Sequence, residues 1–145
     1  MSTQKVIENL KTVLADSYSL FLKTQNYHWN VTGPNFQALH LMFENQYNDL
    51  FSAIDIIAER IRALGEKSPG SYSSFAKMTC INEGDVNHNA TTMIKELAKD
   101  QEKIVESLYK TLKSAQAVGD EATVDIIISR IEIHQKNAWM LNSSL

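Results

Sequence analysis

Apolar residues recur every three or four positions along most of this chain, which is the spacing that one buried face of an α-helix requires. The first such stretch ends near Asn30, and the second follows Gly33 and Pro34, since proline suits the first position of a helix. Gly65 then predicts the end of the second helix. The positions of the two patterns are Val6, Leu10, Val13, Leu14, Ser17 and Phe21, then Phe36, Leu39, Phe43, Tyr47, Leu50, Ile54, Ala58, Ile61 and Leu64.

Residues 66 to about 87 break this pattern and are rich in Ser, Gly and Pro, as loops are. A short helical turn is expected from about Ser74 to Met78. A third helix is predicted from about Asn89 to Ala117, and Asp120 can cap a fourth. The pattern positions of these two helices are Leu97, Ile104, Leu108, Leu112 and Ala115, then Val124, Ile127, Ile128, Ile131 and Ala138.

Four long helices whose second connection is long indicate an all-α fold, a ferritin-like four-helix bundle with a long crossover between the second and third helices. The chain has 145 residues, enough for one domain with a core of its own. We therefore expect residues 1–145 to form a single ferritin-like domain.

The composition excludes several other classes of protein. Hydrophobic residues make up 43% of the chain, as in globular proteins, and no long apolar run predicts a membrane span. No apolar signal region follows Met1–Lys5, so we expect a cytoplasmic protein. A single cysteine, Cys80, fits a reducing compartment and predicts a free thiol without a role.

The net charge of −3 and the pI of about 5.8 oppose nucleic-acid binding, which requires concentrated Lys and Arg. Lys5 is the only basic residue before the first helix, and the chain ends in the uncharged stretch Asn142–Leu145. We therefore predict that DNA binding is weak or absent.

Two imidazoles and two carboxylates form a plausible ligand set for iron or a similar divalent metal: His28, His40, Asp55 and Glu59. His40 and Asp55 are predicted to share one helix, where fifteen residues correspond to roughly 22 Å of rise. They cannot hold the same ion within one chain. If the four groups share a metal, a second copy of the protein supplies half of the site.

The first two helices, if antiparallel, bring His28 near His40. Glu44, Asp55 and Glu59 flank one edge of the apolar stripe, where a neighbouring subunit can pack. A two-fold interface would then build two identical sites at once. The alternative is that acid pairs four residues apart lie on a solvated helix face, and that each histidine serves only in packing or hydrogen bonding.

Ferritin-like di-iron proteins that bind iron within one chain carry Glu-x-x-His pairs on two helices. This chain has no such pair, and the nearest approach, Glu132-Ile133-His134, has the wrong spacing for one helix face. A within-chain di-iron centre is therefore not expected. His88 and His134 are interpreted as surface or packing residues.

The motif His28-Trp29-Asn30-Val31-x-Gly33-x-x-Phe36-x-x-Leu39-His40, followed by Asp55-x-x-x-Glu59-Arg60, resembles the signature of the Dps family of mini-ferritins. The stretch His134–Leu141 is also similar to that family, and the similarity covers essentially the whole chain. The resemblance implies a dodecameric hollow shell that oxidises Fe(II), commonly with hydrogen peroxide, and stores the ferric product. It also implies that the ligands lie at subunit interfaces.

Position by position, the resemblance implies that iron is held by His28, His40, Asp55 and Glu59. Glu44 falls where many relatives have Asp, which keeps the carboxylate but changes its reach. Trp29 would lie beside the site, as an electron donor or as an interface packing residue.

The resemblance also suggests that the start of the fourth helix lines a three-fold pore where acids attract Fe(II): Asp120, Glu121 and Asp125. Acids that favour a helix N-terminus are the alternative explanation, and it suffices for Asp120.

The leading hypothesis is a peroxide-using ferroxidase that also stores iron and protects against oxidative stress. The alternative is a nucleoid-associated, DNA-protecting shell with little iron chemistry. A bundle without metal chemistry, serving as an interaction module or antigen, is a third possibility. The sequence leaves open whether peroxide or oxygen is the oxidant.

Overall fold

The computed structural model describes residues 2–145, and within that range it consists of helices and connecting segments without a β-strand. The expected all-α fold is confirmed. The helices are α1 (Thr3–Asn30), α2 (Phe36–Ala63), α3 (Tyr72–Met78), α4 (Ala90–Ala117) and α5 (Glu121–Asn142).

The starts and ends of the helices follow from local chemistry. The side chain of Asn89 accepts a hydrogen bond from the backbone of α4, and Asp120 does the same for α5, as expected for Asp120. Gly65 and Gly119 adopt φ values of +106° and +71° just after α2 and α4. Glycine reaches this left-handed region without steric cost, which ends a helix sharply.

The expectation that Pro34 occupies the first position of the second helix is wrong. α2 begins at Phe36, and Pro34 lies in the tight turn before it, where the Phe36 N–H donates to the carbonyl of Gly33 at 3.1 Å. Gly33 has a φ of +117°, which only glycine adopts readily. The turn therefore reverses the chain within a few residues and brings the end of α1 against the start of α2.

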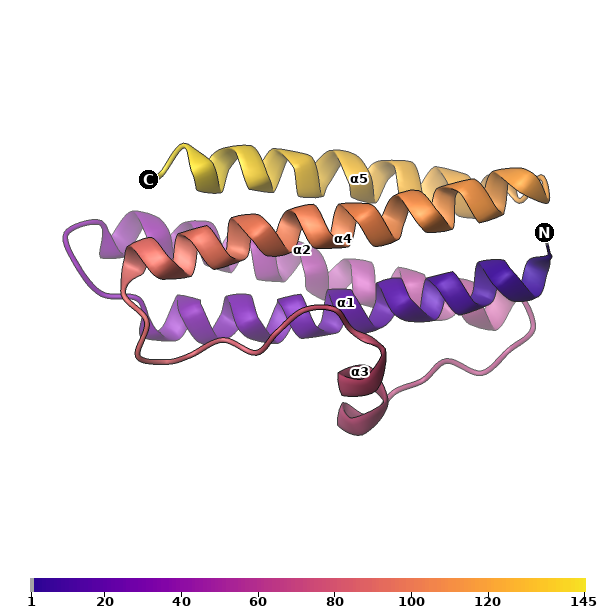
Figure 1. Cartoon of the computed structure of the whole chain (residues 1–145), viewed down its shortest axis with the longest axis horizontal. Helices are drawn as coiled ribbons and strands as arrows, with labels where there is room; N and C mark the ends of the chain where they lie inside the picture. The colour runs from indigo at the N-terminus through magenta and orange to yellow at the C-terminus, as the bar shows by residue number, and fades with distance from the viewer. Residues whose placement is uncertain (1) are drawn as a thin grey trace.

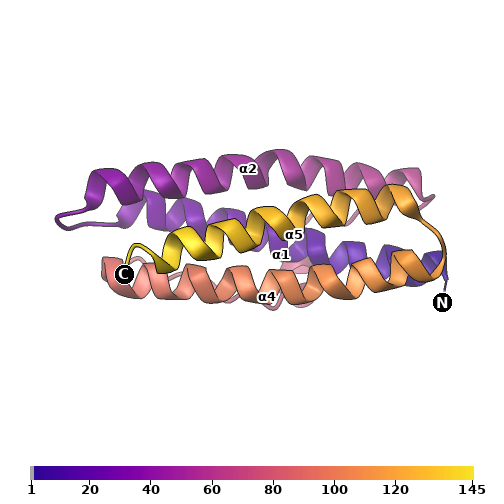
Figure 2. The same cartoon turned by 90° about the horizontal axis from the view of Figure 1, so that it is seen from above.

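The four long helices lie side by side as an elongated bundle, with α1 packed on α2 and α4 packed on α5 (Figures 1 and 2). α2 and α4 both begin at the same end of the bundle, so the chain must return along its full length between them. The segment of residues 64–89 makes this crossover, and α3 lies midway along it, against α1. This is the predicted ferritin-like connectivity.

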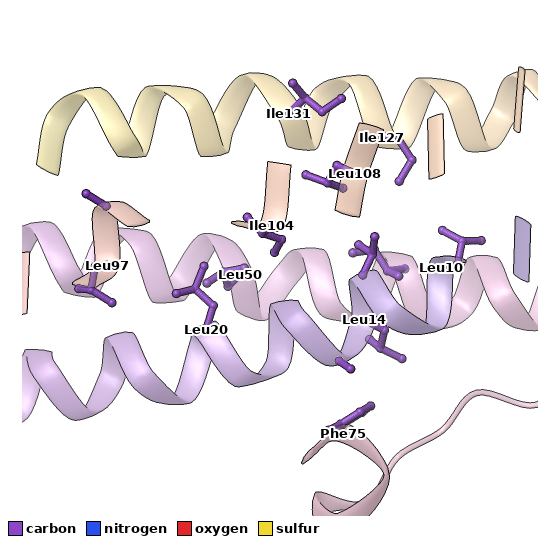
Figure 3. Packing of buried hydrophobic residues seen from close by; sticks show 14 of the residues in the cluster. Leu10, Leu14, Leu20, Leu50, Phe75, Leu97, Ile104, Leu108, Ile127 and Ile131 are labelled. Carbon is purple, nitrogen blue, oxygen red and sulfur yellow. The ribbon is translucent and has the colours of Figure 1, made fainter. Parts of the chain in front are cut away.

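The core consists mainly of aliphatic side chains from all four long helices, with the rings of Tyr27 and Phe43 among them, and Phe75 of α3 covers it from the crossover side (Figure 3). Most pattern positions are buried or half-buried as expected. Two are not: Phe36 is 41% exposed and Ile128 is 51% exposed. The spacing of apolar residues identifies the apolar face of a helix, but it does not show whether that face packs against the same chain or against another subunit.

A buried carboxylate fastens the crossover to the bundle. Asp16 is fully buried in α1 and accepts hydrogen bonds from the Thr79 hydroxyl at 2.7 Å, the Cys80 backbone N–H at 2.9 Å and the Ser107 hydroxyl at 2.8 Å. Burial and the nearby charge of Asp16 raise the pKa of the Cys80 thiol. One side chain thus ties α1, the crossover and α4 together.

A second polar network crosses the core between α2, α4 and α5. Arg130 forms two hydrogen bonds to the carboxylate of Asp49 and donates to His134 Nε2, and His134 Nδ1 donates to the Gln101 carbonyl oxygen at 2.6 Å. Burial and the charge of Arg130 hold the pKa of His134 well below its usual range. His134 is therefore a neutral core residue: of the two roles expected for it, packing is right and the surface location is wrong.

Among the described residues, none of the helices is both long enough and apolar enough to cross a membrane.

We predict that Asp16→Ala destabilises the protein by about 3 kcal/mol, because three donors lose a charged acceptor in a buried place. For a chain of this size, that corresponds to a melting temperature about 6–12 °C lower. Thermal unfolding followed by circular dichroism measures the change. Glu102→Ala, which removes an exposed carboxylate from α4, is the matched control, and equal melting temperatures for the two variants would contradict the role given to Asp16.

Candidate metal centre

Three of the sequence-predicted residues come together where α1 ends and α2 begins. One ligand atom from each of His28, His40 and Glu44 can be chosen so that all three atoms lie within 4.8 Å of one another. His28 is buried and the other two are partly buried. Nitrogen and carboxylate ligands at this spacing can surround one divalent cation.

The two imidazoles hold each other in place through the backbone. His28 Nδ1 donates to the carbonyl of His40, and His40 Nδ1 donates to the carbonyl of His28, each at 2.7 Å. These bonds place the proton of each neutral ring on Nδ1 and leave Nε2 with a free lone pair for a cation. His28 Nε2 already lies 3.7 Å from a carboxylate oxygen of Glu44.

Local sequence explains this arrangement. The turn at Gly33 and Pro34 is short, so the last turn of α1 and the first turns of α2 lie at the same height. His40 and Glu44 are four residues apart and therefore share one face of α2. The side chain of Glu44 thus belongs to the histidine cluster. The sequence pattern, which places Glu44 along the same edge of the helix as Asp55 and Glu59, had left open which half-site it joins.

Asp55 and Glu59 lie on the exposed surface of the same helix, toward its other end. They do not join the histidine cluster, in agreement with the length of α2. The pKa of Glu59 is raised, first because its carboxyl group shares a hydrogen bond with Asp55 and then because the two carboxylates repel each other. The carboxyl groups of Asp55 and Glu59 are therefore close enough to interact directly.

Trp29 follows His28 in the last turn of α1 and is 60% exposed. A large aromatic ring left in solvent next to the cluster suits either of the roles expected for it, electron donation or packing against another subunit.

The three acids of the expected pore differ in their surroundings. Asp120 accepts from the Arg60 guanidinium at 2.7 Å and from the Thr123 hydroxyl. Partial burial opposes ionisation, but these hydrogen bonds outweigh it and hold the pKa of Asp120 below its usual range. Its oxygens are thus engaged in capping and in an ion pair, whereas Glu121 and Asp125 are exposed.

Within residues 2–145, the histidine cluster is the single group of three or more side chains whose ligand atoms lie close enough to hold a metal. The middle of the bundle instead carries the Arg130 network.

Comparison with known proteins gives one family. A profile of the ferritin-like domain matches residues 7–145. The "DNA protection during starvation protein 2" of Bacillus anthracis is 37% identical, with the alignment covering 98% of this chain and 97% of that protein.

Solved structures give the same result. The structure of Dps from Staphylococcus aureus matches with a TM-score of 0.95 at 32% identity, covering 98% of this chain and 95% of the other. The Dps protein from Vibrio cholerae O1, described as a member of a broad superfamily of ferritin-like diiron-carboxylate proteins, matches with a TM-score of 0.93 at 31% identity and covers 97% and 89% of the two chains.

We predict that Asp55→Asn lowers the pKa of Glu59 toward the value of an ordinary glutamate, because the shared proton and the repulsion both disappear. In the unsubstituted protein, Glu59 should lose its proton at a higher pH. Carbon-13 NMR of labelled glutamate in the metal-free protein measures the titration, with Asp125→Asn as a control. A Glu59 titration unaffected by Asp55→Asn would show that the two carboxyl groups do not interact.

Proposed function

The chain belongs to the ferritin-like family and, within it, to the Dps proteins, and on this basis we propose that it is a ferroxidase that oxidises Fe(II) and stores the ferric product. The observation that carries the proposal is the cluster of His28, His40 and Glu44, which has two free imidazole nitrogens beside a carboxylate. The family includes proteins described as diiron-carboxylate proteins, which supports iron as the metal.

The complete site is proposed to form between two subunits. His40 and Glu44 of the histidine half-site lie on the same unbroken helix as the carboxylate half-site, and a two-fold axis midway between them would bring each half against the other half of the partner. That midpoint lies between Asn48 and Phe51. Phe51 is 67% exposed and packs beside Phe21 of α1, so an aromatic patch lies where the two copies would meet.

The proposed chemistry uses the difference between the two ligand types. Imidazole nitrogens bind Fe(II) well, while the anionic oxygens of Glu44, Asp55 and Glu59 stabilise the higher charge of Fe(III) and so favour loss of an electron. With hydrogen peroxide as oxidant, two Fe(II) ions lose one electron each and the O–O bond breaks. The two oxygen atoms take up protons and leave as water, without release of a hydroxyl radical.

We further propose that the whole chain works as one ferritin-like domain in a closed shell of twelve copies. Such a shell would keep the ferric mineral away from the solvent of the cytoplasm and protect the cell against oxidative stress. The Dps membership and the helix-only fold support this assembly.

Entry of Fe(II) is proposed at the start of α5, through Glu121 and Asp125. These two carboxylates are exposed and one helical turn apart, so a ring of them around a symmetry axis would raise the local concentration of cations. Asp120 is not assigned to this role, since Arg60 neutralises it.

A second candidate function is protection of DNA, which the name of the Bacillus anthracis relative favours. The net charge of −3 opposes direct binding to a polyanion. We therefore propose that any protection comes from removal of iron and peroxide rather than from coating the DNA.

The ferroxidase proposal predicts that the double variant His40→Ala, Asp55→Ala oxidises Fe(II) at least about tenfold more slowly than the unsubstituted protein when peroxide is added. His40→Ala removes a ligand from the histidine half-site and Asp55→Ala removes one from the carboxylate half-site, so both halves of every site are damaged. Stopped-flow absorbance measures the rate, and Glu102→Ala controls for loss of a remote carboxylate. Equal rates in all three proteins would refute the proposal.

The entry proposal predicts that Glu121→Gln, Asp125→Asn slows mineral formation about tenfold at low salt, and that added salt narrows the difference because it screens the charges. Light scattering during repeated Fe(II) additions follows the mineral. Glu102→Gln is the control, and a double variant that mineralises at the normal rate would rule out this path.

The proposal on DNA predicts that the protein leaves a linear duplex unretarded in a band-shift experiment, even at low salt. The same preparation should still lower peroxide-dependent cleavage of the duplex by Fe(II). Retardation of the duplex at low salt would contradict the electrostatic argument.

A further inference from the structure

Phe36 and Tyr47 extend the histidine pair into a column of four rings. The rings of His28 and His40 stack with their centroids 3.7 Å apart and their planes at 14°. Phe36 stacks on His40 at 4.9 Å and 26°, and Tyr47 meets His28 at 5.2 Å and 69°. The order along the column is therefore Phe36, His40, His28, Tyr47.

Phe36 is a poor core residue, which makes its position informative. It is the first residue of α2 and is 41% exposed, although the apolar pattern of the sequence predicts it on the buried face. Its ring stacks on His40, a metal-ligand candidate, rather than on a core side chain. The bundle gains little from burying this ring, so its contact with His40 calls for another explanation.

The hydrogen bonds between the two histidines leave one motion open. A bond from Nδ1 to a carbonyl fixes one edge of each imidazole, but the ring can still tilt about that bond and carry Nε2 sideways. A ligand nitrogen must stand about 2.0–2.1 Å from the metal, so a small tilt weakens the bond. Contacts on the ring faces remove this freedom, in the way that surrounding groups orient other metal-binding histidines.

We propose that Phe36 and Tyr47 are positioning residues for the ligand pair, which hold the planes of His40 and His28 so that both Nε2 atoms face one cation. The proposal rests on the ferroxidase function and goes beyond it, because neither residue carries a ligand atom in the cluster. It also assigns a task to the Phe36 of the sequence motif, which the metal ligands alone do not explain.

The competing explanation is that the two rings serve packing only. Tyr47 also meets Phe21 of α1 edge to face at 5.9 Å, and this contact belongs to the bundle surface rather than to the cluster. The test must therefore separate metal geometry from folding and assembly. Tyr109→Leu provides the control, since it removes an exposed aromatic ring from α4, which carries none of the proposed ligands.

The experiment measures binding of Co(II), which follows Fe(II) directly in the order of metal affinities. Binding of Co(II) can be measured without an oxidant, so the readout does not depend on ferroxidase activity. Isothermal titration gives the affinity, the visible spectrum of Co(II) reports the ligand geometry, and size-exclusion chromatography reports the assembly. The variants are Phe36→Ala, Tyr47→Ala, the conservative Tyr47→Phe and the control Tyr109→Leu.

Phe36→Ala and Tyr47→Ala should each weaken Co(II) binding about tenfold to a hundredfold and change its spectrum, while the assembly stays intact. Tyr47→Phe should restore both, because it keeps the ring. Normal affinity and spectrum in both alanine variants would overturn the proposal, as would an equal loss in Tyr109→Leu. His40→Ala distinguishes failure of the proposed metal site from failure of the positioning roles. If His40→Ala also binds Co(II) normally, the proposed site is wrong. If only His40→Ala loses binding, the site stands and the positioning roles of Phe36 and Tyr47 are refuted.

Discussion

The unbroken course of α2 is the constraint on which the rest of this structure depends. Phe36–Ala63 is one helix of 28 residues, so His40 and Asp55 are held roughly 22 Å apart by its rise. No rearrangement of side chains can close that distance. A site that uses both half-sites, as the proposed function requires, would therefore need a second copy of the chain, so that metal binding would depend on assembly.

The remaining elements keep that one helix in register with its neighbours. The short turn after α1 sets His28 against His40, and the reciprocal hydrogen bonds between them are to backbone carbonyls, so they depend on the relative height of two helices. Asp16 fastens the crossover and α4 to α1, and the Arg130 network joins α2 to α5. Polar groups buried in the core thus tie the helices of the bundle to one another.

Sequence periodicity was sufficient for the four long helices, their connectivity and the expectation that the site is shared, because these follow from spacing along a helix. It could not reveal the stacking of His28 on His40, which depends on how a turn sets two helices side by side. It also misjudged Phe36 and Ile128, and it left open whether His134 lies in the core or on the surface. A pattern distinguishes the faces of a helix, but only packing decides whether a face meets the core, solvent or another subunit.

The most direct test of a shared site is complementation between two inactive variants. His28→Ala, His40→Ala lacks one half-site and Asp55→Ala, Glu59→Ala lacks the other, so neither alone can build a complete site. Co-assembled with different affinity tags and purified through both, the mixture should recover about a quarter of the normal peroxide-driven Fe(II) oxidation rate, since half of randomly formed pairs are mixed and each has one intact site. Mixed assemblies that form but stay inactive would show that the two halves do not meet across an interface.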